Sequence, residues 1–171
     1  MLLPDFKDFI EKLPRTGRLL GIDWGARRTG LAISDESWEF VFPREAIVGA
    51  GLARPSIETD GRDWQTQLLQ EIISIIKSEK IVGVVIGLPV RGNGTDSNVT
   101  RMVREFADAF AAETDIPITF INEQLTSVEA EEIIKSKNRK SEIRNRKSEI
   151  DSAAAAVILG NAIAMIKRTI A

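Results

Sequence analysis

The sequence feature that most constrains the fold is a pair of apolar strands joined by a short turn. Residues 18–23 form an apolar run that ends on Asp23, and a second apolar run follows at 29–35. Gly25 and Gly30 lie in and just after the turn. Because glycine has no Cβ, they allow tight turn conformations or the close approach of another group to the backbone. The pattern predicts an antiparallel hairpin with Asp23 at the end of its first strand. At that position Asp23 is either a site residue or an ordinary turn residue.

The rest of the chain alternates helical and extended patterns. A third strand is expected at 39–48, at a sheet edge or bulged, because Pro43 cannot donate to a ladder. The remaining predicted elements are helices over 5–13, 63–80 and 99–111, strands over 81–86 and 116–121, a helix opening on the capping box 126–129, and a closing helix that begins at Asp151. This order predicts an α/β fold whose mixed five-stranded sheet has three antiparallel strands and then two parallel ones, flanked by helices.

Polar residues follow the predicted parallel strands at one edge of this sheet. Asp23 ends the first strand, Gly87 follows the fourth and Glu123 follows the fifth. Ligands of open α/β sheets bind beyond the carboxyl ends of the strands, so these positions define a candidate site. Asp151 stands at the predicted start of the last helix, where a capping box with Ser148 or a favourable dipole contact explains it without any function.

Composition limits the chemistry of such a site. The chain has no Cys and no His, which excludes thiol nucleophiles, Ser-His triads and imidazole or thiolate zinc sites. Carboxylates without these residues favour hard divalent cations such as Mg²⁺ or Mn²⁺. Two such ions would activate a water and neutralise charge on a phosphoryl group in line between them.

The charge balance bears on partners. The net charge of −2 and the pI near 5.4 argue against non-specific coating of nucleic acid. Basic residues do crowd the stretch 135–147, where a near-perfect seven-residue duplication covers 138–144 and 145–151. The pattern is typical of a solvated, mobile surface segment.

Length and hydropathy suggest where the chain works. The 171 residues suit a single domain, and the N-terminal run is too short for a signal peptide. No apolar run is expected to reach the roughly 20 residues that a membrane helix needs. A cytoplasmic location without membrane contact is therefore expected.

Four short motifs resemble, in order, those of the YqgF/RuvX family. They are the hairpin 21–35, Val85-Ile86-Gly87-Leu88-Pro89, Asn122-Glu123-Gln124-Leu125-Thr126 and Asp151-Ser152-Ala153-Ala154-Ala155. Together they extend the likeness over residues 18–168. Members of this family are RNase H-like proteins described as Holliday junction resolvases and as nucleases that mature the precursor of small-subunit ribosomal RNA.

The resemblance implies a single RNase H-like nuclease domain over 1–171 and Mg²⁺- or Mn²⁺-dependent hydrolysis of structured RNA or branched DNA by a monomer or homodimer. It places catalytic metal ligands at Asp23, Glu123 and Asp151. Arg27 and Arg28 match the basic turn of the first motif and are candidate nucleic-acid contacts, together with Arg91 of the long loop after the fourth strand. One departure is Asn122, where the family usually has Asp.

Two other functions remain open at the level of sequence. An actin-like protein that binds ATP also places Asp and Gly after its first strand, but that fold needs two such domains and much more chain. A non-catalytic RNA- or ribosome-binding module with the same fold is the second alternative. The acids at the predicted sheet edge favour the endonuclease, which would process pre-16S ribosomal RNA or resolve Holliday junctions.

Overall fold

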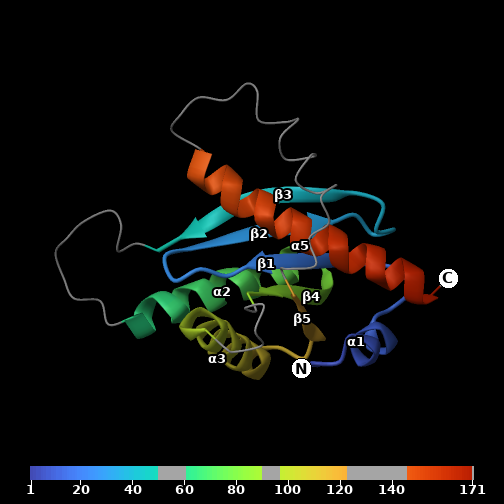
Figure 1. Ribbon diagram of the computed structural model, residues 1–171, viewed down its shortest axis with the longest axis horizontal. Coiled ribbons are helices and arrows are strands. Elements are labelled where there is room, and N and C mark those ends of the chain that lie inside the picture. The colour runs from blue at the N-terminus through green and yellow to red at the C-terminus, as the bar shows by residue number, and fades with distance from the viewer. Residues whose placement is uncertain (50–60, 90–96, 123–145, 171) are drawn as a thin grey trace.

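The computed structural model describes residues 1–49, 61–89, 97–122 and 146–170 of the chain (Figure 1). Its helices and strands follow the predicted order closely. They are α1 (Phe6–Lys12), β1 (Arg18–Asp23), β2 (Arg28–Ser34), β3 (Val41–Val48), α2 (Gly61–Glu79), β4 (Ile81–Leu88), α3 (Asn98–Glu113), β5 (Ile118–Asn122) and α5 (Arg146–Ile170).

The five described strands form one mixed sheet in the order β3-β2-β1-β4-β5. The first three are antiparallel neighbours, whereas β4 pairs in parallel with both β1 and β5. The predicted fold class is thereby confirmed. The expectation for the third strand is also correct, since β3 lies at the edge and its register with β2 shifts between Thr29 and Leu31.

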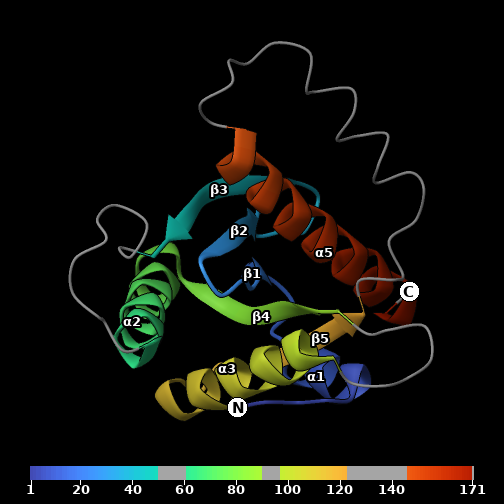
Figure 2. The ribbon, with the colours of Figure 1, turned by 60° about the vertical axis from the view of Figure 1, so that its left-hand side comes forward.

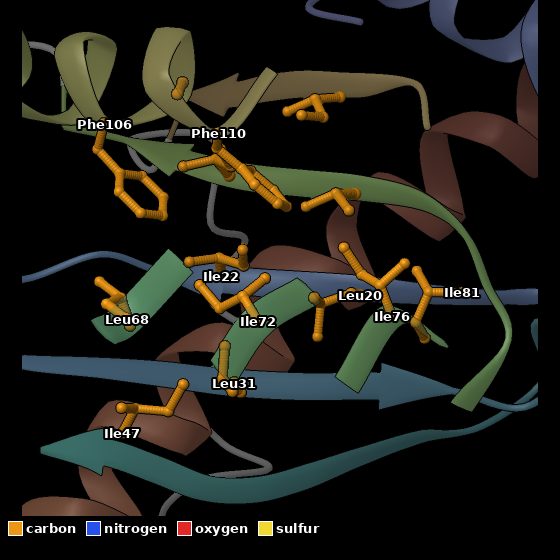
Figure 3. Close-up of a cluster of buried hydrophobic side chains, with 14 of the residues drawn as sticks. Leu20, Ile22, Leu31, Ile47, Leu68, Ile72, Ile76, Ile81, Phe106 and Phe110 are labelled. Atoms are coloured by element: carbon orange, nitrogen blue, oxygen red, sulfur yellow. The ribbon is translucent and has the colours of Figure 1, made fainter. Parts of the chain in front are cut away.

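One face of the sheet is covered by α2 and α3 (Figure 2). Leu20 and Ile22 of β1 and Leu31 of β2 pack there against the apolar stripe of α2, and Phe106 and Phe110 of α3 complete the cluster (Figure 3). Every second residue of a strand points to the same face, which accounts for the alternation along β1 and β2.

The other face is covered by α5, which crosses the sheet diagonally (Figures 1 and 2). Ala155, Leu159 and Ala162 of this helix are buried against Leu19 and its neighbours in a second apolar cluster. Small residues at this interface let the helix backbone approach the strands closely. The core is therefore divided between the two faces, with the sheet as the middle layer.

The start of the last helix differs from the prediction. The helix begins at Arg146 rather than at Asp151, so Asp151 lies inside α5 and not at its cap. Arg, Lys and Glu are good helix formers, and they extend the helix into the second copy of the duplicated basic segment. Residues 146–151 of the duplicated segment are thus helical, while 138–145 and the capping box 126–129 lie outside the described residues.

The expectation about apolar length is also wrong for α5. Judged by length and composition alone, the segment Ile150–Ile170 of this helix could cross a membrane. No other helix among the described residues meets this criterion. A core helix passes the same test, and the apolar face of α5 is packed on the sheet. Of the 18-residue window that meets the criterion, 39% is buried, so packing on the sheet accounts for part of its hydropathy.

Candidate functional site

Asp23 lies at the carboxyl end of β1, on the side of the sheet that carries α5. Leu20 and Ile22 belong to the cluster under α2 and α3, whereas Gly21 between them lies directly under α5. Strand alternation therefore directs Asp23 toward α5 as well. Its half-buried side chain stands opposite Gly30 in the antiparallel pairing of β1 with β2.

Asp151 is brought to the same place by the packing of α5. A Cβ added at Gly30 would lie 2.0 Å from the backbone oxygen of Asp151, so the helix backbone rests directly on this glycine. Because Gly30 is the cross-strand partner of Asp23, the two acids flank one position of the sheet. They are separated by 128 positions in the sequence, and only the packing of the last helix makes them neighbours.

The Asp151 carboxylate leaves one oxygen uncompensated. Its Oδ2 is buried and has no hydrogen-bond partner among the described residues. A buried carboxylate oxygen normally has a partner, since desolvation without one is unfavourable. An unsatisfied oxygen beside a second acid fits a site for a cation.

The turn between β1 and β2 is compact and anchored. A Cβ added at Gly25 would lie 2.5 Å from the backbone oxygen of Arg28, which explains why the turn needs glycine there. The amide of Gly49 donates to the carbonyl of Arg27 at 3.1 Å and ties the turn to the end of β3. Arg27 lies in the turn and is exposed, and Arg28, the first residue of β2, is half-buried, so both predicted phosphate contacts follow Asp23 closely along the chain.

A polar contact also fixes the end of β4 beside the site. Ser97 caps α3, and its capping box with Thr100 is complete. The hydroxyl of Thr100 donates in addition to the carbonyl of Pro89, directly after β4. The N-terminus of α3 is therefore anchored to the carboxyl end of the strand next to β1.

Two predicted site residues lie outside the described residues. Glu123 follows Asn122, the last residue of β5, which pairs with Leu88 at the end of β4. Arg91 falls in the stretch 90–96. Within the residues that are described, no group of three or more His, Cys, Asp or Glu side chains is arranged to hold a metal. Two of the three predicted ligands, Asp23 and Asp151, are thus brought together.

The donor types suit a hard cation. Carboxylate oxygens are the ligands that Mg²⁺ and Mn²⁺ prefer, and water completes the coordination of these ions. Asp23 and Asp151 supply such oxygens, and the unsatisfied Oδ2 of Asp151 shows that one of them is available. The residues present therefore fit a divalent metal.

Sequence reasoning missed the contact that seats α5. Ser152 is buried, and its hydroxyl donates to the backbone carbonyl of Arg44 in β3. Close backbone approach was expected at Gly30, but nothing identified Asp151 as the residue that approaches it. The available signals were the glycine itself and the Asp-Ser pair at 151–152.

The architecture is shared with solved resolvases. RuvC of T. thermophilus in complex with a Holliday junction substrate matches with a TM-score of 0.57 and 12% identity, over 90% of this chain and 96% of that one. The yeast mitochondrial Holliday junction resolvase Ydc2 matches with a TM-score of 0.54 and 14% identity, over 95% and 86%. The fold is therefore the RNase H-like fold of RuvC-type resolvases.

Sequence comparison identifies the family. Residues 17–165 match the RuvX family, described as Holliday junction resolvase. A protein of Maridesulfovibrio salexigens is 37% identical over 83% of this chain and 94% of its own length, and one of Rickettsia canadensis is 30% identical over 98% and 99%. Both are named "Putative pre-16S rRNA nuclease". The chain belongs to the RuvX family of nucleases, and the resemblance inferred from its motifs is confirmed.

Proposed function

We propose that the chain is a divalent-metal-dependent endonuclease that cleaves phosphodiester bonds in structured nucleic acid, with precursor 16S ribosomal RNA as its main substrate. The observation that carries the proposal is the convergence of Asp23 and Asp151 on Gly30, with Oδ2 of Asp151 buried and unpartnered within the described part of the chain. Relatives at 30–37% identity bear the name of a pre-16S rRNA nuclease and support the choice of RNA.

The proposed ligands are Asp23, Asp151 and Glu123, and the proposed metal is Mg²⁺ or Mn²⁺. When bound, the metal supplies activation of water and stabilisation of charge on the phosphoryl group. Asp23 and Asp151 hold it from two elements, the end of β1 and the first turns of α5. In this assignment Glu123, directly after β5, completes the set from the sheet edge.

The arginines of the β1–β2 turn have a separate proposed role. Arg27 is exposed on a turn that is fixed at Gly25 and Gly49, and Arg28 is half-buried where β2 begins. Guanidinium groups bind phosphate oxygens and orient a nucleic-acid backbone without reading its sequence. We assign them, with Arg91, to substrate positioning beside the metal.

Holliday junction cleavage is the second candidate activity. The description of the RuvX family favours it, and the fold is that of RuvC-type resolvases. A resolvase acts on two strands and needs two sites placed symmetrically, so this activity requires a homodimer. A strictly monomeric state in solution would therefore count against junction resolution.

The test is a cleavage assay with the full chain. Precursor 16S rRNA, a four-way DNA junction and a matched linear duplex are each incubated with Mg²⁺ or Mn²⁺, and EDTA serves as the metal-free control. We expect RNA cleavage that Asp23→Asn reduces by about 100-fold or more, because a ligand oxygen and its charge are lost. Asp108→Asn, which removes an exposed acid from α3, should leave the rate unchanged.

The outcomes separate the candidates. Equal cleavage by the wild type and Asp23→Asn would refute the metal site at this sheet edge. Cleavage of the DNA junction but not of the RNA would favour the resolvase. RNA binding without any cleavage under either metal would favour the non-catalytic module.

A further inference from the structure

We propose that Gly30 and Ser152 are positioning residues that set where the Asp151 carboxylate stands relative to Asp23. The inference rests on the proposed function, because it assumes that these two acids share a metal. Neither Gly30 nor Ser152 is assigned a contact with metal or substrate. They act on the position of Asp151 by fixing how α5 packs on the sheet.

Gly30 sets the distance of closest approach. Its φ lies outside the left-handed range, so the backbone at this position does not itself require glycine. The steric reason is the helix: an added Cβ would lie 2.0 Å from the carbonyl oxygen of Asp151 and 2.4 Å from its carbonyl carbon. Both atoms belong to the backbone, which cannot rotate away as a side chain can. Any larger residue must therefore move this part of α5 outward.

Ser152 sets the rotation of the helix about its axis. Successive residues of an α-helix point about 100° apart, so holding one of them fixes the direction of its neighbour. The Ser152 side chain is buried and donates its hydroxyl to the carbonyl of Arg44. That bond holds the turn of α5 that carries Asp151 against the edge strand.

The acceptor is itself held in place. Between Thr29–Ile47 and Leu31–Arg44 the pairing of β2 with β3 advances two residues on β2 and three on β3, which is a β-bulge opposite Gly30. A bulge interrupts the regular ladder and re-aims backbone groups. The Arg44 side chain is paired with Glu79 of α2 at 3.0 Å on the other face of the sheet.

The expected displacement of Asp151 can be compared with the tolerance of a metal site for misplaced ligands. Real Cβ atoms essentially never approach a neighbour within 3.0 Å, so alanine at 30 would displace the Asp151 backbone by about 1 Å. Metal sites tolerate ligand distances within about 0.2 Å of the ideal values. A displacement of this size exceeds that tolerance, and misplacement by 1 Å is known to lower rates by about 100-fold.

The test measures metal binding as well as cleavage. Mn²⁺ affinity is determined by titration calorimetry for Gly30→Ala, Ser152→Ala, Ser152→Thr and the control Gly160→Ala. The control also adds one methyl group, to α5 itself, but at a place with nothing within 4 Å. Near-UV circular dichroism establishes that each variant is folded.

We expect Gly30→Ala and Ser152→Ala to weaken Mn²⁺ binding by about tenfold or more. Their kcat should fall by about 100-fold while KM for RNA stays near the wild-type value, since the arginines of the turn are untouched. Ser152→Thr keeps the hydroxyl and should restore affinity and rate, and Gly160→Ala should match the wild type.

Three results would overturn the inference. A folded Gly30→Ala protein with wild-type Mn²⁺ affinity would refute the role of Gly30. If that variant does not fold, wild-type Mn²⁺ affinity in Ser152→Ala would refute the role of the hydroxyl. Wild-type Mn²⁺ affinity in Asp23→Asn would instead refute the proposed function, and the positioning role with it.

Discussion

At the scale of single residues, two acids of the same hairpin have different roles. Asp23 stands at the carboxyl end of β1, whereas Asp35 directly follows β2 at the opposite end of the sheet. The Asp35 carboxylate accepts hydrogen bonds from the Ser37 hydroxyl and from the amides of Glu39 and Phe40 at 2.8 and 2.7 Å. It organises the connection to β3 and belongs to the structure, not to the site.

The hydrogen bonds of Asp35 lead to a pH-dependent contribution to stability. The side-chain bond from Ser37, followed by the backbone bond from Phe40, lowers the pKa of Asp35 to about 2 from its ordinary value of 3.8. A pKa that is lower in the folded state stabilises the fold above pH 3.8, and this contribution is lost as the pH falls through 2. Asp35→Asn should therefore lower the urea midpoint at pH 7, and its difference from the wild type should narrow between pH 4 and 2.

Urea midpoints of both proteins from pH 2 to pH 7 check this expectation. Asp108→Asn, which also removes one exposed carboxylate, should show no comparable narrowing. A difference between Asp35→Asn and the wild type that stays constant over the whole range would contradict the assigned role.

What the sequence reveals about individual residues depends on the range of their contacts. The neighbourhood of Asp23 made it a candidate, because an apolar strand that ends on an acid is a local pattern. The same pattern suits a turn residue, however, and the predicted sheet edge was needed to favour a site. Asp151 could not be identified in this way, since local spacing explained it as a helix cap, and only the family motifs marked it as a ligand. The contact of its backbone with Gly30 joins residues far apart in the chain, which local patterns do not reveal.

At the scale of elements, the closing helix is seated on glycines of two strands. Gly30 of β2 lies under Asp151, and Gly21 of β1 lies under Ala155 and Leu159. These positions are spaced by four residues along α5, so one stripe of the helix follows the two glycines. The close approach of helix to sheet therefore runs along the helix from the site toward its centre.

The close packing of α5 on the sheet predicts opposite effects of two glycine substitutions on the free energy of unfolding. A Cβ at Gly21 would lie 2.7 Å from Cβ of Leu159 and 2.8 Å from the carbonyl oxygen of Ala155, so Gly21→Ala should lower the free energy of unfolding by about 1–3 kcal/mol. Gly160 lies in the same helix with nothing within 4 Å of an added Cβ. Gly160→Ala should raise the free energy of unfolding by up to about 1 kcal/mol through helix propensity.

Urea unfolding of the two variants and the wild type measures both effects. Each variant is compared with the wild type, because the contact at Gly21 and the gain in helix propensity at Gly160 both enter the difference between the two variants. Gly21→Ala as stable as Gly160→Ala would mean that α5 relaxes away from the sheet without loss, against the close packing described above.

The elements themselves were largely predictable from the sequence, because their signals are local. Amphipathic spacing located α3, and the β-branched run located β4. Boundaries were less accurate where two signals compete. The start of α5 was placed at Asp151, although helix-forming residues before it carry the helix back to Arg146.

At the scale of the whole molecule, the proposed site joins elements from both ends of the chain. Asp23 belongs to the hairpin near the N-terminus, and Asp151 belongs to the last helix. The buried clusters on the two faces of the sheet hold these elements independently of the site. A cation shared by the two acids would connect the α5 layer to the sheet at their common edge.

Metal binding should therefore stabilise the whole fold. A ligand that binds only the folded state at 100 times its Kd raises the free energy of unfolding by about 2.7 kcal/mol. We expect an increment of this size when Mn²⁺ is added to the wild type at that ratio, and its loss on addition of EDTA. Asp23→Asn should lose most of the increment because one ligand is gone, while Asp108→Asn should retain it. Urea unfolding with and without Mn²⁺ measures these differences, and equal increments in Asp23→Asn and the wild type would show that Mn²⁺ binds elsewhere on the protein.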